Sequence, residues 1–214
     1  MSFQTDTYKL LSETLIAKLN ARGMDAVYYE TAAEAKEAIL SEIPAGSAVT
    51  WGGTMTIEEM GLGEAIRNSK DLNFIDRNTA STPEERRKLY AEQTMADYFL
   101  MSANAISMDG QLVNIDGNGN RVACLIIGPS HVFVICGMNK VAPDLSSAIK
   151  RARNIASPIN NVRLNRGNPC TKTGKCEDCL SPNSICNQIV ITRRNSGGPK
   201  GRIKVILIGE TLGY

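Results

Sequence analysis

Four of the six cysteines in this 214-residue chain fall within one short polar stretch, from Asn168 to Asn187. They are Cys170, Cys176, Cys179 and Cys186, with the spacing C-x5-C-x2-C-x6-C. Thiols collected in one loop bind a metal, form disulfides or act as a reactive pair. The stretch contains few apolar residues from which a core could be built, so its composition points to chemistry rather than to packing.

The residue types favour a metal centre but leave its identity open. Only one C-x2-C is present, whereas zinc ribbons usually supply two such pairs. Four thiolates from one loop suit a [4Fe–4S] cluster, although the spacing is not that of a ferredoxin. No histidine is near, and Lys172 and Lys175 would offset the negative charge of a thiolate-bound cluster. We expect an iron–sulfur cluster, with zinc or a metal-free thiol or disulfide loop as alternatives.

The other two cysteines have a different setting. Cys124 and Cys136 lie inside apolar segments that are predicted to be strands. Free cysteine behaves there as a small buried hydrophobic residue. We therefore expect both in the sheet, away from any metal.

A second group of candidates lies where a predicted strand meets a helix. The stretch "TWGGTMTIEEMG" places Gly52, Gly53 and Thr54 at such a junction. Paired glycines let the backbone approach a ligand closely, and the first turn of a helix offers unpaired N–H groups to an anion. The stretch matches neither the P-loop nor the G-x-G-x-x-G pattern, so spacing alone favours a plain turn in which Thr54 or Thr56 caps the helix.

Polar residues in two later stretches could complete a ligand site. Asn104 lies in a predicted strand, where asparagine is disfavoured, so its amide needs partners. Arg121 is a candidate clamp for carboxylate or phosphate because a guanidinium binds these groups in bidentate fashion. Asn139 and Lys140 follow a predicted strand, and ligands of open α/β sheets gather at the carboxyl ends of strands. Lys140 would meet an acidic substrate there, or else be an ordinary solvated lysine.

The elements that must position these residues alternate through the first half of the chain. Helices are predicted before Gly23 and over residues 32–43, 56–68 and 83–96, with strands over 25–30, 47–51 and 72–77 between them. Such alternation is typical of a parallel sheet covered by helices.

The pattern changes after residue 96. Strands without intervening helices are predicted over residues 97–107, 111–115, 122–128 and 131–137, joined at turn glycines and asparagines. A helix over 142–157 should end at Ser157-Pro158, and two last strands, 188–194 and 202–213, should flank a turn. We predict one α/β domain spanning residues 1–214: a three-layer α/β/α fold with a mixed, largely parallel sheet and a cysteine-rich loop at 165–187.

Composition excludes several partners. The chain has 43% hydrophobic and 21% charged residues, and its net charge of +2 comes from 24 basic and 22 acidic side chains. This balance predicts neither a nucleic-acid nor an anionic membrane partner. No apolar run is long enough to cross a bilayer, and the first residues lack the pattern of a signal peptide. We therefore expect a cytoplasmic protein whose thiols stay reduced.

Several segments together resemble the lactate-utilisation (LUD) domain family. The matching features are the Gly-Gly-Thr segment with Glu59 and Gly61, the stretch "NAISMDGQLVNIDGNGNRVA", Gly128-Pro129, and "GMNKV" at 137–141. The resemblance covers nearly the whole chain. It implies the fold of the sugar-phosphate isomerase and CoA-transferase superfamily, whose members bind phosphorylated sugars, CoA thioesters, or folate with ATP.

The resemblance also implies kinship with bacterial proteins that oxidise L-lactate to pyruvate through iron–sulfur subunits. In CoA-transferase relatives a glutamate is the nucleophile, but the resemblance does not align that residue with Glu59, and its role is not carried over. No flavin or nicotinamide fingerprint is visible, so the sequence leaves open whether the chain is an enzyme.

Two functional hypotheses result. In the first, the chain is a redox subunit or accessory protein in the oxidation of L-lactate, or a similar 2-hydroxy acid, with iron–sulfur subunits as partners. In the second, it binds a phosphorylated, nucleotide or CoA-like metabolite, has a structural metal loop and catalyses nothing itself. Both hypotheses require a small anionic metabolite as partner, and both allow a homo-oligomer. The predicted ligand-binding residues are Gly52, Gly53, Thr54, Glu59, Asn104, Arg121, Asn139 and Lys140.

Overall fold

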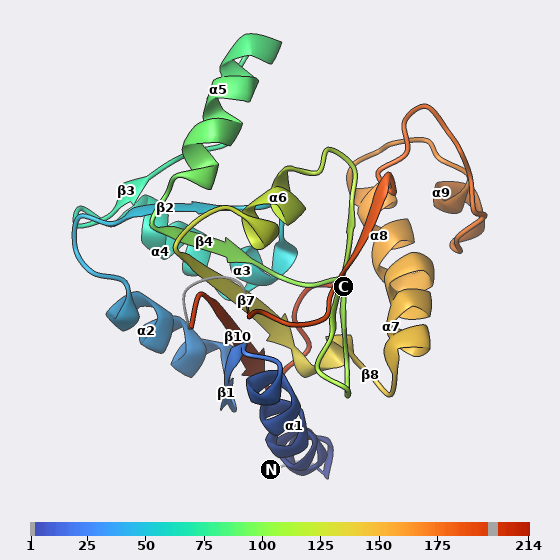
Figure 1. Ribbon diagram of the computed structural model, residues 1–214. Coiled ribbons are helices and arrows are strands. Elements are labelled where there is room, and N and C mark those ends of the chain that lie inside the picture. Colours follow the sequence, from blue (N-terminus) through green and yellow to red (C-terminus); the bar gives the residue numbers. More distant parts are fainter. Residues whose placement is uncertain (1–2, 197–200) are drawn as a thin grey trace.

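A six-stranded parallel sheet forms the centre of the molecule (Figure 1). The structure, a computed structural model, describes residues 3–196 and 201–214. The sheet has the order β1-β10-β7-β4-β2-β3, and every neighbouring pair is parallel. Its strands are β1 (Asp25–Tyr29), β2 (Ala48–Trp51), β3 (Asn73–Phe74), β4 (Tyr98–Met101), β7 (His131–Gly137) and β10 (Ile203–Ile208).

Both faces of this sheet are buried, because alternate side chains of its central strands enter two different cores. On β7, Val132 and Val134 join the core that includes α1 (Phe3–Ala21) and α6 (Asn120–Ile126). Phe133 and Ile135 join the core on the other face. That face is covered by α2 (Ala32–Glu42), α3 (Met55–Glu59) and α4 (Leu62–Arg67). The predicted three-layer α/β/α fold is therefore confirmed.

Two helices begin at capping boxes, which a Thr followed three residues later by a Glu marks in the sequence. Thr31 and Glu34 cap α2 reciprocally, and Thr82 and Glu85 do the same for α5 (Pro83–Thr94). Such pairs satisfy backbone N–H groups that have no partner inside the helix. Helix α5 projects away from the rest of the molecule (Figure 1).

A separate four-stranded sheet holds the antiparallel pairs. Its order is β8-β5-β6-β9, formed by β5 (Ala105–Ser107), β6 (Leu112–Asp116), β8 (Val141–Ala142) and β9 (Gln188–Thr192). Strands β9 and β10, predicted on either side of one turn, lie in different sheets. That turn includes residues 197–200, which are outside the described residues.

The strand predicted over residues 122–128 is wrong. These residues lie in helix α6 and the turn after it. A short apolar run is buried in the same way in a helix and in a central strand, so hydrophobicity does not distinguish the two. Cys124 is consequently buried in a helix rather than in the sheet, whereas Cys136 lies in β7 as predicted.

The helix predicted to end at Ser157-Pro158 continues beyond it. Helix α7 (Leu145–Arg151), a π-helical turn (η2, Ala152–Ala156) and α8 (Ser157–Arg163) follow one another without a break. Proline has no N–H and its ring collides with the carbonyl four residues earlier. The wider π turn just before Pro158 accommodates that ring, which allows the chain to remain helical.

Two short helices complete the fold. The 3-10 helix η1 (Met138–Lys140) follows β7, and α9 (Cys170–Thr173) opens the cysteine-rich loop beside α8 (Figure 1). Within the described residues, no helix is long and apolar enough to span a membrane.

Candidate functional site

A polar cleft of about 380 Å³ lies at the carboxyl ends of β2 and β4, between the two sheets. It is lined by residues that follow β2, β4, β6 and β7, by the end of α8 and by part of the cysteine-rich loop. This edge of a parallel sheet is where α/β proteins place ligands, since the loops leaving the strands meet there. We call this space the polar cleft.

Lys140 is a buried cation in the wall of the polar cleft. Its side chain is 3% exposed, and its ammonium group donates hydrogen bonds to the hydroxyls of Thr56 and Ser102, each at 2.9 Å. None of the described carboxylates forms an ion pair with it. An ammonium has three donors, so one N–H remains for another acceptor.

The surroundings of Lys140 disfavour its charged form. Burial lowers the pKa of Lys140 to about 8, and the cations Arg151 and Arg121 also lower it. Cys136 and Glu59 act in the opposite direction. A buried ammonium without a counter-ion is costly, so an anion that bound beside Lys140 would relieve that cost.

Two predicted ligand residues instead hold the C-terminal segment over Lys140. Glu59 accepts a hydrogen bond from the Gly213 N–H at 2.6 Å. Asn139 accepts from the Leu212 N–H at 3.2 Å and donates to the Gly213 carbonyl at 3.3 Å. Neither Glu59 nor Asn139 lines the polar cleft. Their contacts give them a positioning role, because they fix the backbone that covers the lysine.

Gly213 is the residue that lets this segment pass so close. A Cβ atom there would lie 2.8 Å from Thr56 Oγ1 and 3.1 Å from Lys140 Nζ, and the residue has a φ of +59°. Both the space and the left-handed backbone require glycine at this position.

Arg121 lines the polar cleft, but its guanidinium is engaged by the protein. It donates to the Ser102 carbonyl at 2.9 Å and to the side-chain oxygens of Asn114 and Asn104 at 2.7 and 3.0 Å. Its Nε lies 3.7 Å from a carboxylate oxygen of Asp116. Burial lowers the pKa of Arg121, while Asp116 raises it. The predicted bidentate clamp therefore joins the ends of β4 and β6 and supplies charge to the cleft rather than free donors.

The two glycines after β2 make room for arginines. A Cβ on Gly52 would lie 2.9 Å from the Arg121 side chain, and one on Gly53 would lie 3.0 Å from Arg77 Nη1. The following residue, Thr54, makes no capping hydrogen bond to α3. Its hydroxyl is buried at the cleft with no partner among the described residues. A buried hydroxyl without a partner costs about 1–3 kcal/mol, so Thr54 offers a bond to a ligand.

Three arginines of the polar cleft were not singled out from the sequence. Arg163 donates to Tyr214 Oη at 2.9 Å and to Asn160. In the described part of the chain, the guanidinium groups of Arg77 and Arg166 form no hydrogen bond or ion pair. No motif marks these residues, because they come from loops and a helix end that meet only in the fold. Among the described residues, the cleft is lined by five cationic side chains and one carboxylate side chain: Arg77, Arg121, Lys140, Arg163, Arg166 and Asp116.

A second cavity, of about 160 Å³, lies among the cysteines of the loop, and we call it the cysteine cavity. It is lined by all four of them: Cys170, Cys176, Cys179 and Cys186. Burial raises the pKa of the Cys170 thiol, and the other three thiols raise it further because they lie close. Within residues 3–196 and 201–214, no three cysteine, histidine or carboxylate side chains are arranged as ligands of one metal ion.

The two cavities share a wall. Ile115, on β6, and Ser184, in the cysteine-rich loop, line both of them. The loop therefore contributes to the polar cleft on one side and to the cysteine cavity on the other.

Comparison with models of protein families shows which family the chain belongs to. The model of the LUD domain matches residues 12–208. The chain belongs to the LUD domain family. The resemblance seen in the sequence is thus confirmed, and the family is one associated with lactate utilisation. Comparison with curated proteins gives no significant match.

Solved structures similar to this LUD domain include the crystal structure of a DUF162 family protein from Deinococcus radiodurans at 1.70 Å resolution. The TM-score is 0.57 at 13% identity, covering 94% of this chain and 98% of that one. Ribose 5-phosphate isomerase from Plasmodium falciparum gives a TM-score of 0.34 at 12% identity, covering 79% of each chain. A D-ribose-5-phosphate isomerase in complex with phospho-erythronic acid gives 0.34 at 14%, covering 53% and 54%. Only the first similarity supports a shared fold.

Proposed function

We propose that this LUD domain binds a small anionic metabolite in the polar cleft, and does so in the utilisation of lactate or a similar 2-hydroxy acid. The observation that carries the proposal is Lys140: a cation 3% exposed, bonded to two neutral hydroxyls, unpaired with any described carboxylate and open to the cleft. Buried charges are normally paired, and a ligand anion is the partner that this geometry leaves room for.

The charge of the polar cleft favours a ligand with more than one negative charge. Of the side chains that the structure describes, five cations line it and Asp116 supplies one carboxylate. A monocarboxylate such as L-lactate would neutralise only one of these cations, whereas a phosphorylated metabolite would neutralise two. The volume of about 380 Å³ falls within the range of small-molecule sites, which is roughly 300–1,000 Å³. We therefore favour a phosphorylated sugar, nucleotide or CoA-like ligand over L-lactate itself.

A second candidate function is that of a redox subunit or accessory protein in the oxidation of L-lactate to pyruvate, beside iron–sulfur subunits. One observation favours it: the cysteine cavity shares Ile115 and Ser184 with the polar cleft. A redox centre held by the cysteines would lie next to the bound metabolite. The two candidates differ in the ligand, since this one requires a 2-hydroxy or 2-oxo acid in the cleft.

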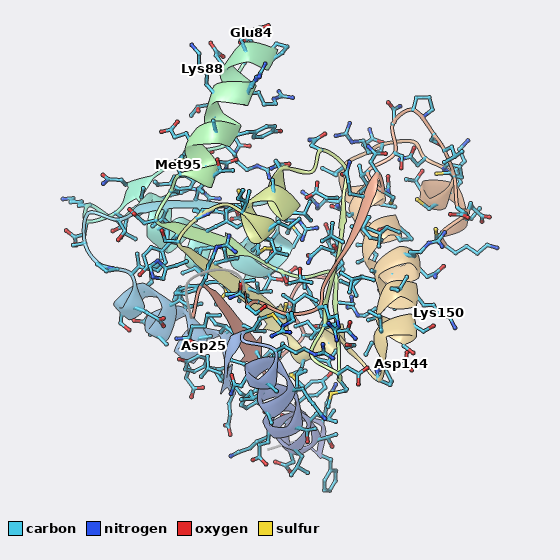
Figure 2. The ribbon with its side chains drawn as sticks, viewed as in Figure 1. Asp25, Glu84, Lys88, Met95, Asp144 and Lys150 are labelled. Atoms are coloured by element: carbon cyan, nitrogen blue, oxygen red, sulfur yellow. The ribbon has the colours of Figure 1, made fainter. Side chains whose placement is uncertain are left out.

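Isothermal titration calorimetry would test the proposal. The ligands are ribose 5-phosphate, AMP, CoA, L-lactate and pyruvate, and the proteins are the wild type, Lys140→Met and the matched control Lys88→Met. Lys88 is exposed on α5 (Figure 2) and does not line the polar cleft. Loss of one charge-assisted hydrogen bond costs about 1.5–3 kcal/mol, so Lys140→Met should weaken binding of a phosphorylated ligand roughly 10- to 100-fold. Equal affinity in Lys140→Met and Lys88→Met would refute the proposal, and binding of only L-lactate or pyruvate would support the redox candidate instead.

A further inference from the structure

We infer that Cys170, Cys176, Cys179 and Cys186 bind a [4Fe–4S] cluster in the cysteine cavity, and that this cluster fixes the loop segment forming one wall of the polar cleft. The first part depends only on the cysteines. The second part rests on the proposed anion site, because it links the cluster to binding in the cleft.

The cysteine-rich loop lacks a core of its own. Between the end of α8 at Arg163 and the start of β9 at Gln188, its only regular element is the four-residue helix α9. Leu180 is 100% exposed. Ordering backbone costs roughly 1–2 kcal/mol per residue, and loops of this length are uncommon in compact domains unless they are functional. Four metal–thiolate bonds would supply the missing stabilisation, since structural metal sites contribute about 10 kcal/mol to folding.

The backbone turns the thiols toward one space. Gly174 and Asp178 both have left-handed backbone, with φ of +74° and +50°. These two bends lie on either side of Cys176 in the chain, and Cys170, Cys176 and Cys179 line the cysteine cavity with Cys186. Asp178 is one of two non-glycine residues with positive φ in the described part of the chain. Such backbone is uncommon for a non-glycine residue, and strained positions of this kind cluster at functional sites.

The size of the cysteine cavity favours a cluster over a single zinc ion. In a tetrahedral zinc site the sulfurs lie about 2.3 Å from the metal, which leaves no room between them for anything else. The cavity that these cysteines line together with ten other residues has a volume of about 160 Å³, which is room for several waters. A cavity of this size at the four thiols leaves room for a multinuclear iron–sulfur core, whose usual ligands are four cysteines.

A positive charge is already in place beside the thiols. Arg153 Nη2 lies 3.5 Å from Cys176 Sγ and also pairs with Asp178. Arg153 belongs to the π-helical turn η2, and π turns inside helices occur frequently at functional sites. An N–H donor to a ligand sulfur offsets part of the negative charge that four thiolates bring, and such bonds help to set the reduction potential of a cluster.

The loop transmits the state of the cysteine cavity to the polar cleft. Asn168, two residues before Cys170, donates to the Asn183 carbonyl at 3.1 Å, and Asn183 lines the cleft. Asn187, which follows Cys186, donates its N–H to the Asp116 carbonyl at 3.0 Å. Fixing Cys186 on a metal would therefore fix the cleft wall between Asn183 and Asn187.

Metal analysis after anaerobic purification tests the first part. The proteins are the wild type, Cys176→Ala and Cys179→Ala in the loop, and Cys124→Ala as control, because Cys124 is buried in α6 and does not line the cysteine cavity. We expect about four iron and four acid-labile sulfide per chain, with broad visible absorbance, in the wild type and the control. The two loop variants should lose most of it while their circular dichroism remains that of a folded α/β protein. Equal iron in the wild type and both loop variants would overturn the inference. So would zinc without sulfide, or no metal after reconstitution of the wild type with ferrous iron and sulfide.

Binding of inorganic phosphate tests the second part. Cluster-loaded wild type should bind phosphate at least 10-fold more tightly than chelator-treated wild type, because the wall of the polar cleft loosens when the cluster is removed. Equal affinity in both forms would overturn the link. Lys140→Met should keep its iron and lose phosphate binding. If the wild type holds the cluster but binds no anion, the proposed function fails while the cluster assignment stands, so the two failures are distinguishable.

Discussion

Replacing Lys140 by methionine should change how stability depends on pH. In the folded chain the pKa of Lys140 is lowered to about 8 from an ordinary value of 10.5, chiefly by burial. Below pH 8 both the folded and unfolded chains hold the proton. Between pH 8 and 10.5 only the unfolded chain holds it, so a rise in pH over this window favours the folded state.

The magnitude follows from the width of that window. Each pH unit between the two pKa values is worth about 1.4 kcal/mol. From pH 7 to pH 9.5 the wild type should therefore gain about 2 kcal/mol of stability from Lys140 that Lys140→Met cannot gain. At neutral pH the variant is relieved of a desolvation cost of about 3 kcal/mol but loses two hydrogen bonds, so its own stability should change little.

Urea unfolding at both pH values measures this difference. Other titrating groups affect the wild type and the variant alike, so their contributions cancel in the comparison. The stability of the wild type minus that of Lys140→Met should grow by about 2 kcal/mol between pH 7 and 9.5, whereas the same comparison with Lys88→Met should be flat. A flat profile for Lys140→Met as well would refute the view that a desolvated, unpaired ammonium lines the polar cleft.

Three further predictions follow from the polar cleft. Thr54→Val removes a buried hydroxyl without a described partner, so it should stabilise the ligand-free protein by about 1 kcal/mol in urea unfolding and weaken phosphate binding. A loss of stability would show that the hydroxyl already has a hydrogen-bond partner. Gly52→Ala places a Cβ 2.9 Å from the Arg121 side chain and should cost about 1–3 kcal/mol of stability. An unchanged denaturation midpoint would mean that the Arg121 side chain shifts to make room at no cost. Phosphate affinity of the wild type should fall as pH rises above about 8, where Lys140 loses its proton, and calorimetry that shows constant affinity from pH 7 to 9.5 would exclude Lys140 from the site.

Local signals predicted the scaffold well, because they act over a few residues. The Thr31–Glu34 and Thr82–Glu85 capping boxes mark where two helices begin, and both occur in the structure. The sequence also predicted at which edge of the sheet the candidate residues meet, since parallel strands joined by helices direct their carboxyl ends the same way. Gly53, Thr54, Asn104, Arg121 and Lys140 accordingly line one cleft.

Long-range contacts account for what the sequence could not predict. Glu59 and Asn139 bind the backbone at Gly213, which follows each of them by more than seventy residues. No local sequence pattern predicts a contact over that separation. Arg121 was expected to clamp a ligand, but its guanidinium donates to acceptors on β6 and in the connection between β4 and β5, Asn104 among them. Pro158 was read as a helix stop because the compensating π turn has no recognised sequence signal.

A crystal structure of the protein with its tightest-binding phosphorylated ligand tests the central claim most directly. We predict a phosphate oxygen within hydrogen-bonding distance of Lys140 Nζ, supplying the acceptor that its third N–H lacks, and a second contact from the Thr54 hydroxyl. A ligand bound elsewhere, with Lys140 still bonded only to Thr56 and Ser102, would contradict it.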